Sequence, residues 1–480
     1  MDRVEVKIYH TNDMHASISA MSRLSHFIRR LRQADQAAGI VTFYWDAGDA
    51  ADRNIEVVSL TKGAAFYDVL NAMGIELQAS GNDLSMTYGP QVLADCAARA
   101  DFPILAANLR DGPEGAIVPG LQESTIIEFS PEVKIAVFGL TAPADGIYEV
   151  FGYHLPKTIA FTSQLIARLK SEAIQGIVLL SHLGLAEDRL LAEAVDGIDL
   201  IVGSHTHDLI PAGEWVNGTL IVQAGEYARC VGCIHLELAD ETGGIVAARA
   251  EVLEVPPDEF PDPIFEAALE TANREIAELK NRVIGELESP LETSFFVESR
   301  FGNFSADALR SYMQAEIGIL MSGLLTGGLP EGKITLGDLN SACFTTANPC
   351  RSNLQGRDLK AALEKGLDPS VYSFMHKSFR GSPIGIPQIS GIEVRFDPAA
   401  KVGMKISKIT VGGEYLDPDR SYLVAHTDAE VMPEFGYFDL NQAAGSYSEV
   451  PTILPEVLAL YLKDPSTSRN AEMGRWYGPE

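Results

Sequence analysis

The chain has 480 residues, of which 46% are hydrophobic, and it carries a formal charge of -29. This length and hydrophobic content predict two or three globular domains with substantial cores. So negative a charge disfavours a nucleic-acid polymer or an anionic membrane surface as the partner, because both bind basic patches. A small phosphorylated ligand stays open, since bound metal ions can reverse the field locally.

The ends of the chain and its cysteines narrow the class of protein further. The sequence begins MDRVEVKIYH, with no apolar leader, and no run of 18 apolar residues occurs. These features predict a cytoplasmic protein without a membrane span. Five cysteines do not make a disulfide framework, and the CxxC pair of Cys230 and Cys233 is interpreted as thiols on a strand rather than as a zinc site. The sequence does not determine the oligomeric state.

The first half of the chain alternates short apolar strands with helical patterns. In the segment 4–10, Val4, Val6 and Ile8 alternate with other residues as in a strand, and apolar residues recur at helical spacing over 24–31. This alternation predicts an α/β sandwich. Further strands are predicted at 40–46, 75–80, 102–109, 134–143, 176–182 and 198–203, with strand following strand from about residue 219.

A proline-rich segment divides the chain. Residues 255–263 contain four prolines, which cannot continue a helix or a central strand. A charged helix is predicted over 264–283. We therefore expect domains at 1–255 and 286–480, joined by a linker and connecting helix at 256–285, and we expect the second domain to move relative to the first.

Residues that can bind metal follow five of the predicted strands in the first domain. The carboxyl ends of parallel strands meet at one edge of a sheet, where ligands bind. Taken singly, each residue has a structural alternative: Asp13 could cap a helix that begins near Ser19 or Met21. Their recurrence at five strand ends instead predicts a metal site made of Asp13, His15, Asp49, Asn82, His182, His205 and His207.

The types of ligand indicate the chemistry. On an extended segment, His205 and His207 would point to the same side, and a metal would keep both imidazoles neutral. Histidine and carboxylate ligands with one amide, and without cysteine, suit Mn, Zn, Fe or Co and disfavour a structural zinc site. Seven ligands exceed one tetrahedral site and suit two divalent ions that share a bridging carboxylate.

Several segments resemble the motifs of the calcineurin-like metallophosphoesterases, and more narrowly of the 5'-nucleotidase / UDP-sugar hydrolase family. In the first domain these are YHTNDMHA, WDAGDAADR, SGND, LSHLGL, GSHTHD and AGEYARCVG. In the second domain FGNFSADALR (301–310), GKITLGDL (332–339), LQGRDLKAALEKGL (354–367) and ISGIEVRFDP (389–398) resemble phrases of the family's C-terminal domain.

The resemblance implies a fold, a function and a set of ligand roles. The fold is an N-terminal four-layer αββα sandwich followed by a C-terminal α/β domain of the 5'-nucleotidase type, which binds the substrate. The function is metal-dependent hydrolysis of a phosphate ester or pyrophosphate bond in a small metabolite such as a nucleotide or nucleotide-sugar. Asp13, His15 and His207 would hold the first ion, and Asn82, His182 and His205 the second, with Asp49 bridging.

The chain departs from the family next to the metal site. The family reads Gly-Asn-His-Glu where this chain reads Gly81-Asn82-Asp83-Leu84. The family's His assists the leaving oxygen, and the Asp that orients it would fall on Met86 or Thr87. We expect Asp83 to lie in the active site as a poor general acid, because two dications would lower its pKa and keep it ionised. Its carboxylate would then hydrogen-bond the attacking water or a metal-bound group.

The substrate-reading positions of the second domain differ too. Thr326 stands at the family's substrate-contacting Arg, and Cys350 at a Phe that stacks on a base. The segment 426–437 lacks the Gly-Gly-Asp near the second stacking aromatic. Three functions therefore stay open: a phosphoesterase, a relative with other chemistry on the same metals such as a thiosulfohydrolase, and a metal-retaining binding or sensor protein.

Overall fold

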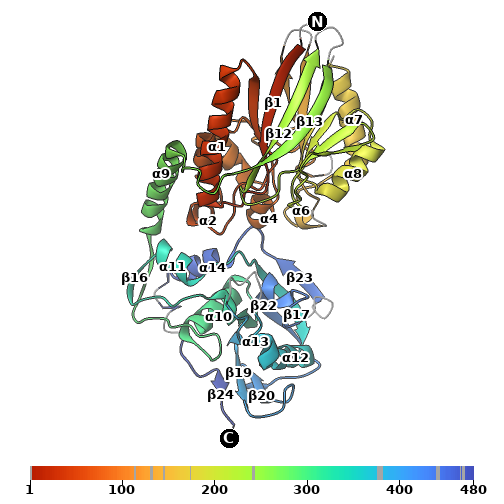
Figure 1. Cartoon of the computed structure of the whole chain (residues 1–480). Helices are drawn as coiled ribbons and strands as arrows, with labels where there is room; N and C mark the ends of the chain where they lie inside the picture. The colour runs from red at the N-terminus through yellow and green to blue at the C-terminus, as the bar shows by residue number, and fades with distance from the viewer. Residues whose placement is uncertain are drawn as a thin grey trace. The chain divides into compact units, whose positions relative to one another are not determined.

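The computed structural model describes residues 3–112, 115–129, 133–143, 146–172, 174–239, 244–375, 382–438, 444–464, 466–467 and 471–479 (Figure 1). The chain forms two compact units, Met1–Ile276 and Ala277–Glu480. Among the helices of these residues, none has both the length and the apolar character needed to cross a membrane. All five cysteines are free thiols.

Unit 1 contains two β-sheets. The first has the strand order β13-β12-β1-β2-β3-β4-β5, and β1 to β4 run parallel to one another. The second has the order β10-β11-β9-β8-β7-β6, with β7, β8, β9 and β11 parallel. The strands are β1 (Arg3–Thr11), β2 (Val41–Asp46), β3 (Leu77–Ala79), β4 (Ile104–Leu105), β5 (Leu121–Gln122), β6 (Ser124–Glu128), β7 (Lys134–Leu140), β8 (Gly176–Ser181), β9 (Leu200–Val202), β10 (Glu214–Val216), β11 (Thr219–Val222), β12 (Cys230–Ala239) and β13 (Gly244–Glu254).

The two sheets pack face to face and are covered by helices on their outer faces. Val6 and Trp45 of the first sheet share one buried cluster with Val178 and Leu200 of the second. These positions alternate along their strands, which places every second side chain between the sheets. The predicted four-layer αββα sandwich is thereby confirmed. The helices of unit 1 are α1 (Ile18–Ala37), α2 (Glu56–Thr61), α3 (Phe66–Met73), α4 (Asp83–Tyr88), α5 (Val92–Arg99), α6 (Ile147–Val150), α7 (Thr158–Lys170), α8 (Leu185–Ala194) and α9 (Pro263–Lys280).

Helix α1 covers the outer face of the first sheet, while α7 and α8 cover that of the second (Figure 1). Asp35 of α1 accepts hydrogen bonds from Tyr9 and Lys7, the residues of β1 that point away from the core. Helix α1 begins at Ile18, after Ser17. The alternative role of Asp13 as a helix cap is therefore wrong, and its carboxylate belongs to the site described below.

Some strands are shorter than their apolar runs predict. The run 102–109 pairs only at Ile104–Leu105. Its continuation leaves the sheet as a buried loop, in which Asn108 exchanges hydrogen bonds of 2.8 and 2.9 Å with the backbone of Thr141. The amide side chain satisfies the backbone groups there, so an apolar run does not have to become a strand.

The proline-rich segment is anchored on α1. Glu259 contacts His26 at 2.7 Å, and Asp262 accepts hydrogen bonds from Ser25 and Arg29. Asp262 also caps the first turn of α9 through the Ile264 amide at 2.9 Å. The predicted helix over 264–283 corresponds to α9, and the predicted domain motion stays a prediction.

Unit 2 is built on a five-stranded sheet of order β18-β15-β22-β17-β23 and a four-stranded sheet of order β21-β20-β19-β24, while β14 pairs with β16. Its strands are β14 (Val283–Leu287), β15 (Ile317–Met321), β16 (Gly332–Thr335), β17 (Pro349–Gln355), β18 (Pro387–Ser390), β19 (Ile392–Phe396), β20 (Ile406–Val411), β21 (Glu414–Tyr415), β22 (Ser421–Thr427), β23 (Ala444–Ser448) and β24 (Trp476–Tyr477). Its helices are α10 (Arg300–Tyr312), α11 (Leu336–Ala342), α12 (Gly356–Gly366), α13 (Pro369–Tyr372), α14 (Leu454–Tyr461) and the short 3-10 turns η1 (Ser322–Leu324) and η3 (Asp428–Val431).

The core of unit 2 forms around α10. Phe301 and Phe304 of this helix are fully buried and share a cluster with Ile319 of β15 and Val424 of β22. Ser299 caps the helix by accepting a hydrogen bond from the Gly302 amide. The predicted α/β architecture of the second domain is confirmed.

Candidate metal centre

The seven predicted ligands follow five strand ends and are brought together in unit 1. Three of these strands, β1, β2 and β3, belong to the first sheet, and β8 and β9 belong to the second. The site thus lies where the ends of two packed sheets meet, rather than at the edge of one. Ligand atoms lie within 4.8 Å of one another in the groups Asp13, His15 and His207, and Asp49, His182 and His205.

The ligands stand on strained loops. Asp13, His15, Asp49, His205 and His207 all have positive φ angles, between 45° and 74°. A non-glycine residue in this region costs energy and persists only where neighbouring interactions hold it. Here the amide of Asp13 donates to the Gly48 carbonyl at 3.0 Å, and the amide of His15 donates to the Asp49 carbonyl at 2.9 Å. These bonds join the loops after β1 and β2.

The expected geometry of the two neighbouring histidines is wrong. Strand β9 ends at Val202, and His205 and His207 follow in left-handed turns rather than on an extended segment. Their side chains therefore go to different groups: His205 joins Asp49 and His182, and His207 joins Asp13 and His15.

In the first group three ligand atoms converge. His15 Nε2 lies 3.1 Å from His207 Nε2, and His207 Nε2 lies 3.4 Å from Asp13 Oδ1. Asp13 is fully buried and also accepts hydrogen bonds from Asn12 and Ser204. Two imidazole nitrogens this close, with a carboxylate beside them, form a donor set that one cation can occupy.

The second group is centred on His182. Its Nε2 lies 3.0 Å from Asp49 Oδ2 and 3.0 Å from Asn82 Oδ1. Asp49 can form a metal-binding group with His182 and His205, and another with His15 and Asp83. Its carboxylate therefore lies between the two groups of ligands, as a bridging ligand would.

The second ring nitrogen of three histidines is already engaged. His182 Nδ1 lies 2.9 Å from the Ala47 carbonyl, His207 Nδ1 lies 2.6 Å from Glu226 Oε2, and His15 Nδ1 lies 3.1 Å from Asp83 Oδ2. Each of these acceptors holds a proton on Nδ1 and leaves Nε2 for a metal, an arrangement typical of metal-binding histidines. The donor set and its supporting acceptors thus fit divalent ions.

Glu226 is a residue of the candidate site that the sequence reasoning missed. It lies in the segment AGEYARCVG, just after β11, and the following residues read as a strand. An acidic residue at the end of a further strand of the second sheet was the available signal. The position of Glu226 beside His207 depends on a turn in which the Tyr227 amide donates to the Asp13 carbonyl at 2.9 Å.

The charges of the cluster are strongly coupled. The hydrogen bond that His207 donates to Asp13 raises the pKa of His207 to about 9 despite partial burial. Burial lowers the pKa of His182, but the charge and hydrogen bond of Asp49 outweigh it, and the pKa rises to about 9. In the absence of a cation, these two pKa values favour the protonated forms of His182 and His207, and a bound cation would displace those protons.

Asp83 contacts the predicted ligand His15 and can form a metal-binding group with His15 and Asp49. It is the first residue of α4, and its amide donates to Asp49 Oδ1 at 3.0 Å. Burial raises the pKa of its carboxyl, an effect that the hydrogen bond to His15 opposes. The lowered pKa expected of Asp83 concerns the metal-loaded site and stays a prediction. Thr87, one of the two positions for the missing orienting Asp, accepts a hydrogen bond from Arg53 at 3.2 Å.

The altered positions of unit 2 offer no stacking surface. Cys350 is buried on β17, with its thiol 3.0 Å from the Ser448 hydroxyl. Phe435 and Tyr437, the aromatics of the segment 426–437, are 7% and 2% exposed. The Thr326 hydroxyl donates to the backbone carbonyl of Ser341 at 2.9 Å. At these positions no ring can stack on a base.

Comparison with known proteins is consistent with this geometry. Residues 275–436 match the family model of the 5'-nucleotidase C-terminal domain. The chain is 29% identical over 457 residues to the uncharacterized metallophosphoesterase YunD of Bacillus subtilis, covering 95% of this chain and 98% of that one. It is 23% identical to the 5'-nucleotidase of Bos taurus over 532 residues, covering 94% and 90% of the two chains.

Solved structures share the fold. The NAD nucleotidase of Haemophilus influenzae superposes with a TM-score of 0.62 at 16% identity, over the full length of both chains. Metallophosphoesterases work with divalent metal ions, which the donor set described above can bind. Residues 275–436 match the 5'-nucleotidase C-terminal domain, and the chain is similar over nearly its whole length to metallophosphoesterases and 5'-nucleotidases, which indicates a hydrolase of phosphoric ester bonds.

Proposed function

We propose that this protein hydrolyses a phosphate ester or pyrophosphate bond of a small metabolite, such as a nucleotide or nucleotide-sugar, with two divalent ions bridged by Asp49. The observation that carries the proposal is the convergence of imidazole Nε2 atoms on carboxylates while three of the Nδ1 atoms are engaged elsewhere. In this proposal Asp13, His15 and His207 hold one ion, and Asn82, His182 and His205 hold the other. Mn, Zn, Fe and Co all suit this set.

We further propose a division of labour along the chain. Residues 1–255 form the metallophosphoesterase domain, 256–285 connect, and 286–480 bind the substrate. The anchoring of residues 259–275 on unit 1 supports assigning the connecting segment to the first unit.

When bound, two such ions hold an attacking water and the phosphate oxygens together for in-line displacement. The chain's own contribution is to position the ligands. Asp83 accepts from His15 Nδ1, and Glu226 accepts from His207 Nδ1, so both rings are fixed in orientation and tautomer. The Ala47 carbonyl does the same for His182. Asp83 is therefore a positioning residue and a poor proton donor to the leaving oxygen.

A second candidate is a metal-retaining binding protein with little turnover. It is favoured by the replacement of the family's His by Asp83 and by the burial of Phe435 and Tyr437. Loss of a positioned acid costs about 10²–10⁴ in rate, and loss of stacking costs about 1–3 kcal/mol per base. Both losses fall on substrates that need acid assistance or base recognition, while activated phosphates need neither.

The test combines elemental analysis with a hydrolysis screen. The purified chain is reconstituted with Mn, Co or Zn and assayed on phosphorylated metabolites and on an aryl phosphate. We expect two ions per chain and turnover that His182→Ala abolishes. The matched control is His154→Ala, because His154 is a partly exposed histidine outside the cluster.

The outcomes separate the two candidates. Two bound ions without turnover on any phosphate would favour the binding protein. One ion, retained after Asp49→Ala, would overturn the bridged pair.

A further inference from the structure

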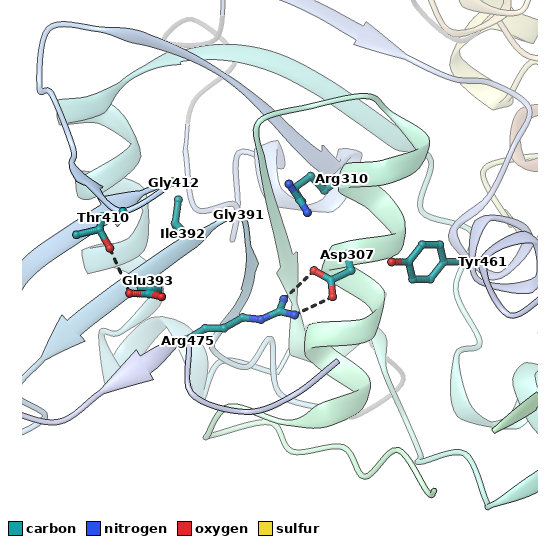
Figure 2. A pocket seen from close by; sticks show the side chains of 10 residues that line it. Asp307, Arg310, Gly391, Ile392, Glu393, Thr410, Gly412, Tyr461 and Arg475 are labelled. Atoms are coloured by element: carbon teal, nitrogen blue, oxygen red, sulfur yellow. Dashed lines mark hydrogen bonds and ion pairs between the residues drawn. The ribbon is translucent and has the colours of Figure 1, made fainter. Parts of the chain in front are cut away.

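Unit 2 contains a cavity of about 460 Å³ whose lining includes neither Thr326 nor Cys350. Residues of α10, the turn between β18 and β19, β20, α14 and the C-terminal segment line it (Figure 2). Its polar side chains come from Asp307, Arg310, Glu393, Thr410, Tyr461 and Arg475. The volume is within the range of small-molecule sites.

Both carboxylate oxygens of Asp307 accept hydrogen bonds from neighbouring side chains. Arg475 donates to both of its oxygens, Nη1 to Oδ1 at 2.9 Å and Nη2 to Oδ2 at 2.7 Å. The Ser390 hydroxyl adds a third hydrogen bond to Oδ1 at 2.5 Å. Figure 2 shows the bidentate pair at one side of the cavity. Because Asp307 and Arg475 neutralise each other, the Asp307 carboxylate does not balance the second cation of the cavity.

That other cation is Arg310, in the last turn of α10. Its Nε is buried and has no hydrogen-bond partner among the described residues, and no ion pair links its guanidinium to any of them. Leaving a buried donor of a charged group unpaired is costly. The chain carries 66 acidic residues against 37 basic ones, so a cation without a carboxylate partner in a cavity calls for an explanation.

Two glycines make room for this side chain. A Cβ at Gly318 would lie 3.1 Å from Arg310 Cβ, and one at Gly391 would lie 3.2 Å from Arg310 Cδ. The fold therefore keeps the stem of Arg310 in place at the wall of the cavity, and Figure 2 shows its guanidinium on the side of α10 toward Gly391.

We propose that this cavity binds a small metabolite through a phosphate or carboxylate group held by Arg310. Guanidinium groups bind such oxyanions through paired, charge-assisted hydrogen bonds. On the opposite wall the Thr410 hydroxyl donates to the Glu393 carboxylate at 3.4 Å, and the oxygens of both side chains can accept hydrogen bonds from hydroxyl groups of the same ligand. A hydroxylated phosphate or carboxylate would satisfy both walls.

The residues that line this cavity include no predicted metal ligand and none of the family's substrate positions. The metal ligands all belong to unit 1, and Thr326 and Cys350 lie on other elements of unit 2 than those that line the cavity. The proposal therefore stands whether or not the protein turns over a phosphate ester.

The experiment is calorimetric titration of the full-length chain with two probes, inorganic phosphate and succinate. An Asp49→Ala background removes phosphate binding at the proposed metal centre. Arg310→Gln removes the unpaired guanidinium, and Arg357→Gln is the control, because Arg357 is an exposed arginine of the same unit outside the cavity. Circular dichroism and the unfolding midpoint establish that the variants fold.

We expect saturable binding of at least one probe, with the affinity weakened about tenfold or more by Arg310→Gln and unchanged by Arg357→Gln. The preferred probe identifies the anion as phosphate or carboxylate. The proposal is overturned if neither probe binds saturably up to about 10 mM, a concentration that reaches even millimolar sites, or if both arginine variants weaken binding equally, which would indicate non-specific anion binding.

Discussion

The carboxylates behind the two histidines of the first ligand group give the sharpest prediction. Asp83→Ala and Glu226→Ala each remove the acceptor of one Nδ1 proton and leave all seven proposed ligands in place. The backbone amide of Asp83, which donates to Asp49, is kept in the alanine variant. Both changes should therefore weaken the ion held by His15 and His207 and affect the ion at His182 much less.

The distances set the order of the effects. Glu226 lies 2.6 Å from His207 Nδ1, a short charge-assisted contact, whereas Asp83 lies 3.1 Å from His15 Nδ1. Loss of such a supporting acceptor typically lowers metal affinity about 10- to 100-fold, which corresponds to about 1.4–2.7 kcal/mol. We expect Glu226→Ala near the upper end of this range and Asp83→Ala near the lower end.

The measurement is metal affinity by competition with a chromophoric chelator, with metal content per chain determined after dialysis. Asp52→Ala is the matched control, because Asp52 lies 3.8 Å from His15 Nδ1, too far for a hydrogen bond. We expect one of two equivalents to be weakened in each test variant. Equal loss of both equivalents, or an Asp52→Ala effect as large as that of Asp83→Ala, would refute the reasoning.

Three further predictions follow from the same structure. Asp49→Ala should lose both ions and activity, and metal should no longer raise its unfolding temperature. A ligand at 100 times its Kd stabilises a native protein by about 2.7 kcal/mol. A metal-induced rise in unfolding temperature that persists in Asp49→Ala would therefore contradict the bridging role of Asp49. With Asp83 at the His position, alkyl phosphates should turn over about 10²–10⁴ times more slowly than aryl phosphates, and equal kcat/KM values would argue against a missing acid. His426 is buried, and burial lowers its pKa to about 4. The unfolded state therefore takes up a proton near pH 6.5 while the folded state does not, and unit 2 should lose about 2 kcal/mol of stability between pH 7 and pH 5. His426→Gln should remove this loss in urea-dependent hydrogen exchange of β22, and an unchanged pH dependence would assign it to other groups.

The gathering of these residues in one place was predictable because it depends on a local rule. Each strand end is marked by an apolar run, and the first polar side chains after it lie at the carboxyl edge. That rule found residues that follow β1, β2, β3, β8 and β9. It could not reveal that these strands belong to two sheets, since pairing partners are not written in the apolar pattern of a single strand.

The backbone conformation of the loops could not be predicted from the sequence. The assumption of an extended segment for His205 and His207 failed because positive φ angles at both residues turn their side chains to different ligand groups. The same limit hid Glu226, whose role depends on a turn that brings it back to His207. The lack of an ion-pair partner for Arg310 among the described residues could not be predicted from the sequence, because it depends on residues that are distant in sequence. Here Arg475 pairs with Asp307, the carboxylate that could otherwise have paired with Arg310.

The net charge of the proposed centre indicates that an anionic substrate is bound through direct contacts rather than attracted from a distance. Asp13 and Asp49 as ligands, with Asp83 and Glu226 behind the histidines, carry four negative charges, which equal the charge of two dications. A phosphate approaching a loaded site therefore meets no net positive field from these groups, and the chain as a whole carries -29. Long-range steering of an anionic substrate is unfavourable under these conditions. Affinity must instead come from direct contacts that replace the water around the phosphate, and these depend on ligand orientation. The carboxylates that hold His15 and His207 thus contribute through geometry more than through charge.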